Sequence, residues 1–248
     1  MSNTQSCSEF SLAQGESMRG TAPRVNIWML LEYTDIWAHD PIKSNSLPTD
    51  VQLWIHRTVD FLKQGGRYPR VQMIRGSRSE RSEYSIYIAE SGELRHHKFR
   101  SYDEILDLDI YNAPGELVDS NMYFVCTHGT RDRCCAKLGH RTWTVLNELS
   151  NGRAWQCSHL GGHRFAPNVL VLPQARLYGR VHAESATSFF RVVEDYGIAT
   201  AYLRGRSEFE PEEQVREIGI EPERDGPIQI RESCSKNELK TVFPFTET

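Results

Sequence analysis

The chain has 248 residues, of which 39% are hydrophobic and 25% are charged, and its formal net charge is −4. This composition is typical of a globular protein with one large core or two small ones, and the lack of a basic excess argues against nucleic-acid binding. No apolar run approaches the roughly 18–20 residues that cross a bilayer. The chain start lacks the basic end and apolar stretch of a secretory signal. We therefore expect a cytoplasmic protein without a membrane or nucleic-acid partner.

The first half of the chain is expected to alternate strands and helices. Residues 24–33 are rich in strand-forming side chains. Apolar residues recur at helical spacing over 49–64, between a proline and a pair of glycines. The same criteria predict further strands at 70–76, 84–91 and 94–100 and a short helix at 101–110.

The second half repeats this order after a turn-like segment at 112–116. The predicted elements are a strand at 121–126, a helix at 137–150, strands at 153–159, 168–173 and 176–181, and a helix at 186–197. Both halves thus follow the order β-α-β-β-β-α, which suits a thioredoxin-like α/β fold with helices layered on a mixed sheet. We expect two related halves in tandem, divided into an N-terminal α/β domain (1–112), a second α/β domain with the candidate site (113–205) and a charged C-terminal tail (206–248).

Cysteine and histidine gather in the second half. Four of the six cysteines lie between residues 126 and 157, and four of the nine histidines lie between residues 128 and 163. Cys126 ends a predicted strand, Cys134 and Cys135 precede a predicted helix, and His159 and His163 enclose a Leu-Gly-Gly loop. The carboxyl ends of strands and the starts of the following helices meet at one edge of an α/β sheet. Such clustering predicts a metal or redox site.

Three kinds of site fit these residues. A zinc ion accepts two thiolates and two imidazoles, but eight residues separate Cys126 from Cys135, whereas zinc fingers usually have two to four. A 2Fe–2S cluster is larger and tolerates a wider loop, and Rieske centres use the same donor types, although the Rieske spacing is absent. Thiol redox chemistry at the adjacent Cys134 and Cys135 is the third alternative, although neighbouring cysteines seldom reach disulfide geometry.

Three motifs identify a family resemblance. CTHGTRDRCCAKLG (126–139), CSHLGGHRFAPNVLVLP (157–173) and LYGRV (177–181) resemble the sucrase/ferredoxin-like family, and the resemblance extends over roughly residues 7–207. It implies a thioredoxin-like ferredoxin domain over 113–205 with a 2Fe–2S cluster.

The resemblance also implies the ligands of that cluster, which are Cys126, one of Cys134 and Cys135, His159 and His163. We favour Cys135, because the family pattern places the ligand cysteine just before a small residue and close to a glycine, here Ala136 and Gly139. Cys134 is the alternative ligand. His128 lies in the ligand loop and is a candidate hydrogen-bond donor to the cluster, although we expect a solvent-facing or capping role for it.

The functional expectation is a one-electron carrier whose reduction is coupled to protonation of His159 or His163. Its redox partner would be a flavoprotein or a ferredoxin reductase. The alternative is a Cys2His2 protein that uses zinc for folding or senses redox state. A substrate-converting enzyme is not expected, because no acidic pair stands out that would suit a glycosidase. Among the remaining thiols, we expect Cys157 in the core and Cys7 and Cys234 to be incidental.

Overall fold

The computed structural model describes residues 5–77, 83–110, 115–236 and 238–247. Four strands and one helix of the first half lie close to their predicted positions. They are β1 (Ile27–Glu32), α2 (Thr49–Gln64), β2 (Pro69–Arg75), β3 (Tyr84–Glu90) and β4 (Glu93–Phe99). The predicted helix at 101–110 is instead a 3-10 helix, η1 (Tyr102–Asp107), whose N-cap residue makes no side-chain hydrogen bond. A two-residue strand, β5 (Glu116–Leu117), comes after it.

The second half also has a strand, a helix and three further strands, but a 3-10 helix lies between the first two of those strands and an α-helix follows the last. It consists of β6 (Met122–Cys126), α3 (Arg133–Leu149), β7 (Ala154–Cys157), η2 (His163–Phe165), β8 (Val169–Leu172), β9 (Arg176–Tyr178), α4 (Ala186–Tyr196), η3 (Thr200–Tyr202) and β10 (Leu203–Arg206). The predicted start of the long helix at residue 137 is wrong. This helix begins at Arg133, because Asp132 caps it.

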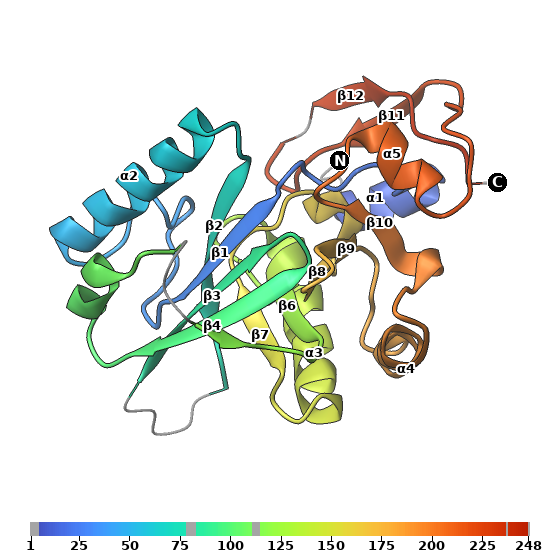
Figure 1. Cartoon of the computed structure of the whole chain (residues 1–248). Helices are drawn as coiled ribbons and strands as arrows, with labels where there is room; N and C mark the ends of the chain where they lie inside the picture. Colours follow the sequence, from blue (N-terminus) through green and yellow to red (C-terminus); the bar gives the residue numbers. More distant parts are fainter. Residues whose placement is uncertain (1–4, 78–82, 111–114, 237, 248) are drawn as a thin grey trace.

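All ten of these strands form one sheet in the order β10-β9-β8-β6-β7-β2-β1-β3-β4-β5 (Figure 1). Parallel pairing joins β1 to β2 and β6 to β7, and the other neighbours pair antiparallel. The sheet is therefore mixed and mostly antiparallel, and the prediction of an α/β fold is confirmed. The two halves of the sheet meet at β2 and β7, where Ile74 pairs with Cys157 and Arg75 with Gln156.

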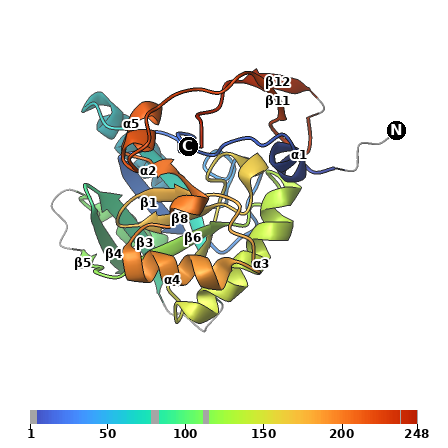
Figure 2. The same ribbon diagram turned by 90° about the vertical axis from the view of Figure 1, so that its right-hand side faces the viewer.

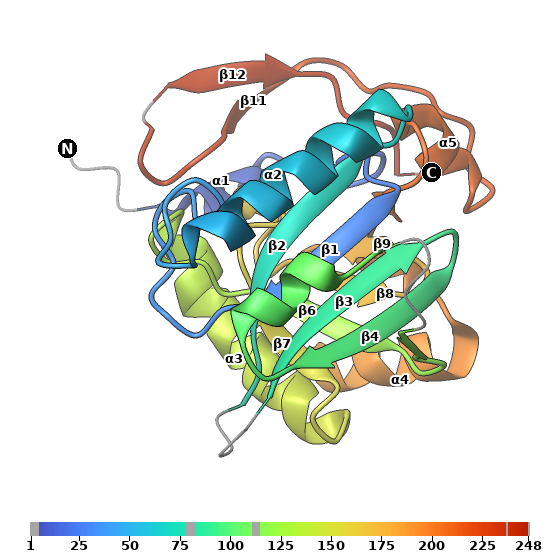
Figure 3. The same ribbon diagram turned by 60° about the vertical axis from the view of Figure 1, so that its left-hand side comes forward.

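Three apolar clusters hold the layers together. In the first half, α2 buries Val51, Ile55 and Leu62 against one face of β1 and β2 (Figure 3). In the second half, α3 and α4 pack side by side on β6 and β8 (Figure 2). The third cluster contains side chains from both halves of the sheet, among them Trp28 and Phe124. The two halves thus share a core, and the candidate site lies at its edge.

The chain ends pack on the second half. The helix α1 (Cys7–Ala13) contacts β11 (Ile228–Arg231), which forms a hairpin with β12 (Leu239–Val242), and α5 (Pro211–Arg216) packs on β10 (Figure 1). The region after residue 206 was expected to be a charged tail with short strands around Ile228 and near Val242, and it contains the strands β11 and β12. The division of the chain after residues 112 and 205 remains a prediction. Within the described parts of the chain, no helix has both the length and the apolar character needed to span a membrane.

Candidate metal centre

Cys126 is the last residue of β6 and is only 1% exposed. Because side chains alternate along a strand, Tyr123 and Val125 face α3 and α4, whereas Cys126 faces the core shared by the two sheet halves. Cys157 lies opposite it in β7 and is fully buried in the same core, as predicted. The end of β6 therefore presents a thiol to the inside of the protein.

The first turn of α3 separates the two adjacent cysteines. The Asp132 carboxylate accepts a hydrogen bond of 2.9 Å from the backbone N–H of Cys134 and so fixes the start of the helix. Consecutive helical residues point about 100° apart, so the two thiols have different neighbours. Cys135 contacts His159, whereas Cys134 contacts Cys7 and Cys234.

Gly139 allows α3 to cross the end of β6. A Cβ atom at this position would lie 2.0 Å from the backbone oxygen of Cys126. Only glycine therefore permits this close approach. Since Gly139 lies one helical turn after Cys135, the contact holds Cys135 beside Cys126.

Three donor atoms converge at this point, namely the Sγ atoms of Cys126 and Cys135 and the Nδ1 atom of His159. His159 Nδ1 lies 4.0 Å from Cys126 Sγ and 3.9 Å from Cys135 Sγ, and all three atoms lie within 4.8 Å of one another. The hydrogen bond from Cys135, and then one from His159, lowers the pKa of Cys126. The hydrogen bond between the two cysteines raises the pKa of Cys135. Cys126 is thus favoured as a thiolate, the form that binds metals.

His163, the fourth predicted ligand, lies next to His159 but outside the group of three converging donor atoms. Its ring stacks on that of His159 with 4.8 Å between ring centroids. Its Nδ1 atom is buried and has no hydrogen-bond partner among the residues that the structure describes. Burial, followed by the nearby His159, lowers the pKa of His163, which favours the neutral ring. A neutral imidazole with an unused lone pair is a metal donor.

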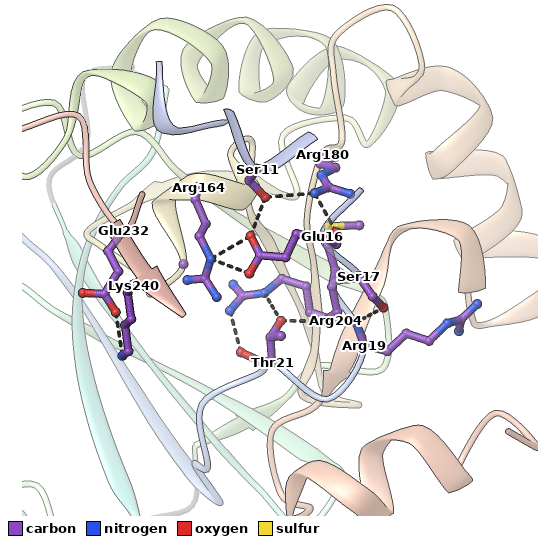
Figure 4. A network of polar contacts seen from close by, with 12 residues as sticks. Ser11, Glu16, Ser17, Arg19, Thr21, Arg164, Arg180, Arg204, Glu232 and Lys240 are labelled. Atoms are coloured by element: carbon purple, nitrogen blue, oxygen red, sulfur yellow. Dashed lines mark hydrogen bonds and ion pairs between the residues drawn. The ribbon is translucent and has the colours of Figure 1, made fainter. Parts of the chain in front are cut away.

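The loop between the two histidines is tightly held. Gly161 and Gly162 have φ angles of +91° and +67°, which side chains disfavour. Arg204 donates hydrogen bonds of 2.9 Å to the backbone oxygen of Gly161 and to Asn168 Oδ1, and Asn168 Nδ2 donates to Gly162. Figure 4 shows Arg204 beside Thr21, with Arg164 and Glu16 next to it.

His128 is 1% exposed, so the expectation of a solvent-facing role is wrong. Its Nδ1 atom accepts a 3.2 Å hydrogen bond from the backbone N–H of His159, and its Nε2 atom lies 2.8 Å from the backbone oxygen of Ala38. The neutral ring protonated at Nε2 satisfies both contacts. His128 therefore positions His159 and links it to the loop after β1. That loop is distant in the sequence, so no local pattern indicates this role.

A second group of cysteines lies on the other side of the first turn of α3. The Sγ atom of Cys134 lies 3.6 Å from that of Cys7 and 3.1 Å from that of Cys234. Hydrogen bonds from Cys7 and then Cys234 lower the pKa of Cys134 to about 6 despite burial. Cys7 and Cys234, which we expected to be incidental, both contact Cys134. They are 227 residues apart, so no spacing in the sequence indicates this group.

Comparisons with known proteins place the chain in a family. The profile of the sucrase/ferredoxin-like family matches residues 18–205. Altered inheritance of mitochondria protein 32 from Meyerozyma guilliermondii is 31% identical over 77 residues, which is 27% of this chain and 27% of that protein. The matched part thus spans about a quarter of that relative's length. No solved structure matches the chain. Because the family profile covers well over half of the residues, the chain belongs to the sucrase/ferredoxin-like family.

Proposed function

We propose that Cys126, Cys135, His159 and His163 hold a 2Fe–2S cluster and that the protein is a one-electron carrier. The observation that carries this proposal is the unused Nδ1 atom of His163, which is buried and belongs to a ring stacked on that of His159, one of the three residues with converging donor atoms. The donors form a thiol pair and a stacked imidazole pair, which suits a cluster with two thiolates at one iron and two imidazoles at the other. When bound, such a cluster accepts and releases one electron.

The surroundings of the thiols favour an added electron. The backbone oxygen of His159 accepts a 2.8 Å hydrogen bond from the half-buried Arg70, and the charges of Arg70 and of the buried Arg204 both act on the Cys126 thiolate. Burial and the nearby Arg164 and Arg70 lower the pKa of Arg204 to about 9, so it stays mostly charged at neutral pH. Positive charge near the site stabilises a more negative, reduced state.

A cavity lies on one side of the site. This cavity of about 210 Å³ is lined by Arg70, Arg131, His128 and His159, among others. The positive residues at this cavity fit an acidic redox partner, such as a flavoprotein or a ferredoxin reductase. We place this exchange in the cytoplasm.

The histidines would couple electron transfer to proton transfer. Two neutral imidazoles in place of thiolates remove negative charge, so we expect a potential above that of plant-type ferredoxins, about −400 mV. His159 or His163 would take up a proton when the electron arrives. The potential should then fall by up to about 59 mV per pH unit, the value for one proton per electron. A potential independent of pH between roughly 6 and 10 would contradict this coupling.

The strand order supports the proposal that each half has a thioredoxin-like fold. Within the second half the order is β7-β6-β8-β9, with α3 between β6 and β7 and α4 after β9. Within the first half the order is β2-β1-β3-β4, with α2 between β1 and β2. We therefore infer two related thioredoxin-like units, of which the second is the ferredoxin domain.

Zinc is the second candidate occupant, because three donor atoms within 4.8 Å of one another also suit a single ion. Spectroscopy of protein purified without oxygen separates the two, with iron, sulfide and zinc assayed on the same sample. We expect equal amounts of iron and sulfide and an EPR signal after reduction with dithionite. A colourless protein whose zinc is lost on Cys126→Ser would exclude the electron carrier and leave a structural or redox-sensing zinc site.

A further inference from the structure

The second group of thiols is as compact as the first. The Sγ atoms of Cys7, Cys134 and Cys234 form a triangle with sides of 3.6, 3.1 and 3.4 Å. Cys7 and Cys134 are buried, and Cys234 is half-buried. None of the three belongs to the proposed cluster site, because Cys134 points away from Cys135. The function proposed above therefore leaves this group unexplained.

The triangle suits a metal ion better than a disulfide. Two thiolates bound to one tetrahedral zinc ion lie about 3.8 Å apart, since each Zn–S bond is about 2.3 Å. The three sides are within 0.7 Å of that separation, whereas a disulfide requires about 2.05 Å. A disulfide would also join two of the thiols and leave the third unpaired, although the three separations are similar. A single ion accommodates all three thiols together.

Asp132 supplies a fourth donor. Both of its carboxylate oxygens lie 4.0 Å from Cys7 Sγ. The carboxylate is fixed by hydrogen bonds of 2.9 Å from the backbone N–H groups of Cys134 and Cys234 and of 3.0 Å from Ser233 Oγ. These three bonds orient the carboxylate and, of its roughly four lone-pair sites, leave one on Oδ1 for an ion.

Hydrogen bonding to sulfur also fits a site built for thiolates. The backbone N–H of Cys7 points to Cys234 Sγ at 3.4 Å, a contact that stabilises negative charge on sulfur. A cavity of about 330 Å³, lined in part by Ser8, Arg133 and Cys134, lies beside the group and offers a route for the ion.

We propose that Cys7, Cys134, Cys234 and Asp132 bind one zinc ion, separate from the site of the 2Fe–2S cluster. Binding displaces the thiol protons to solvent and changes no oxidation state. The ion joins α1 and the segment after β11 to the first turn of α3. The adjacent residues Cys134 and Cys135 thus serve two different sites, and the zinc ion fixes the helix start from which Cys135 projects.

The test is metal analysis combined with zinc-edge X-ray absorption on the whole chain, purified without oxygen from zinc-supplemented medium. We expect about one zinc per chain with three sulfur neighbours and one oxygen. Cys7→Ser and Cys234→Ser should each lose most of this zinc. Cys126→Ser should retain it while losing iron and sulfide. Cys157→Ala removes a buried thiol outside both groups and should leave zinc unchanged.

Three results would overturn the proposal. The first is unmodified protein without zinc, and the second is zinc that Cys126→Ser removes while Cys7→Ser retains it. The third is a disulfide among the three thiols, found by mass spectrometry of the protein purified without oxygen. The zinc-edge X-ray absorption spectrum of the unmodified protein identifies the ligand atoms even if a variant fails to fold. Since zinc and iron are assayed separately, the zinc site and the cluster can fail independently.

Discussion

The two halves of the sheet share a strand order but differ in the loop after their first strand. Six residues lie between β6 and α3, and they bring Cys126 and Cys135 together. Sixteen residues lie between β1 and α2, and this longer loop reaches across to the site. Through Trp37 and Ala38, its backbone oxygens accept hydrogen bonds from Thr130 and His128. The first half thus supports a site whose donors all come from the second.

The largest expected effect is on iron and sulfide content, when each of the two adjacent cysteines is substituted separately. Cys135→Ser should abolish iron and sulfide binding, because it removes a thiolate from the converging donors. Cys134→Ser should retain both, since its thiol faces Cys7 and Cys234. Iron and sulfide assays with EPR spectra of both variants check this. If Cys134→Ser lost iron and Cys135→Ser retained it, Cys134 and not Cys135 would be the cluster ligand.

Gly139→Ala should have the second largest effect. The added methyl group would lie 2.0 Å from the Cys126 backbone oxygen, so α3 must move away from β6 and take Cys135 with it. We expect a loss of about 1–3 kcal/mol in the free energy of unfolding and reduced iron content. Denaturant unfolding and iron assays measure both. Gly65→Ala, at the end of α2 in the first half, is the matched control, because its nearest contact would be 3.4 Å.

His128→Ala tests the support that the first half gives. It leaves the His159 N–H and the Ala38 oxygen without their partner, which should cost about 1–3 kcal/mol in unfolding free energy. The variant should also lose iron faster to a chelator. His140→Ala, on the exposed side of α3, should change stability by no more than about 0.5 kcal/mol. Equal chelation rates for the two variants would argue against a positioning role for His128.

Arg70→Gln should act on the potential more than on the occupancy of the site. Arg70 belongs to β2 of the first half and interacts with Cys126. Removal of one positive charge should lower the reduction potential by on the order of 50 mV. Protein-film voltammetry measures this shift. Arg67→Gln removes an exposed arginine that pairs with Glu90 and should leave the potential unchanged.

The smallest expected effect is the contribution of His97, in the first half, to the pH dependence of the unfolding free energy. Burial, followed by the nearby Arg95, lowers the pKa of His97 in the folded protein. Below about pH 6.5 the unfolded chain therefore binds a proton that the folded chain does not. Stability should fall as the pH falls through this range, by less than about 1 kcal/mol from this residue. His97→Gln should flatten the curve of unfolding free energy against pH, and an unchanged curve would refute the assignment.

Patterns within single segments predicted most strands and the position of Cys126, because alternation and strand-forming side chains act locally. The start of α3 was missed because the capping role of Asp132 lies inside a charged run that resembles a loop. The roles of His128, Cys7 and Cys234 depend on partners that are distant along the chain. Such contacts exist only once the two halves pack, so local patterns carry no sign of them.

The support from the loop after β1 changes how sequence variation in this protein should be interpreted. Ala38 and His128 are separated by 90 residues, yet one hydrogen bond joins them. A change near Ala38, in a loop that supplies no donor to the cluster site, would therefore weaken that site much as the loss of a donor does. Variants of this loop should be grouped with those of the histidines and cysteines.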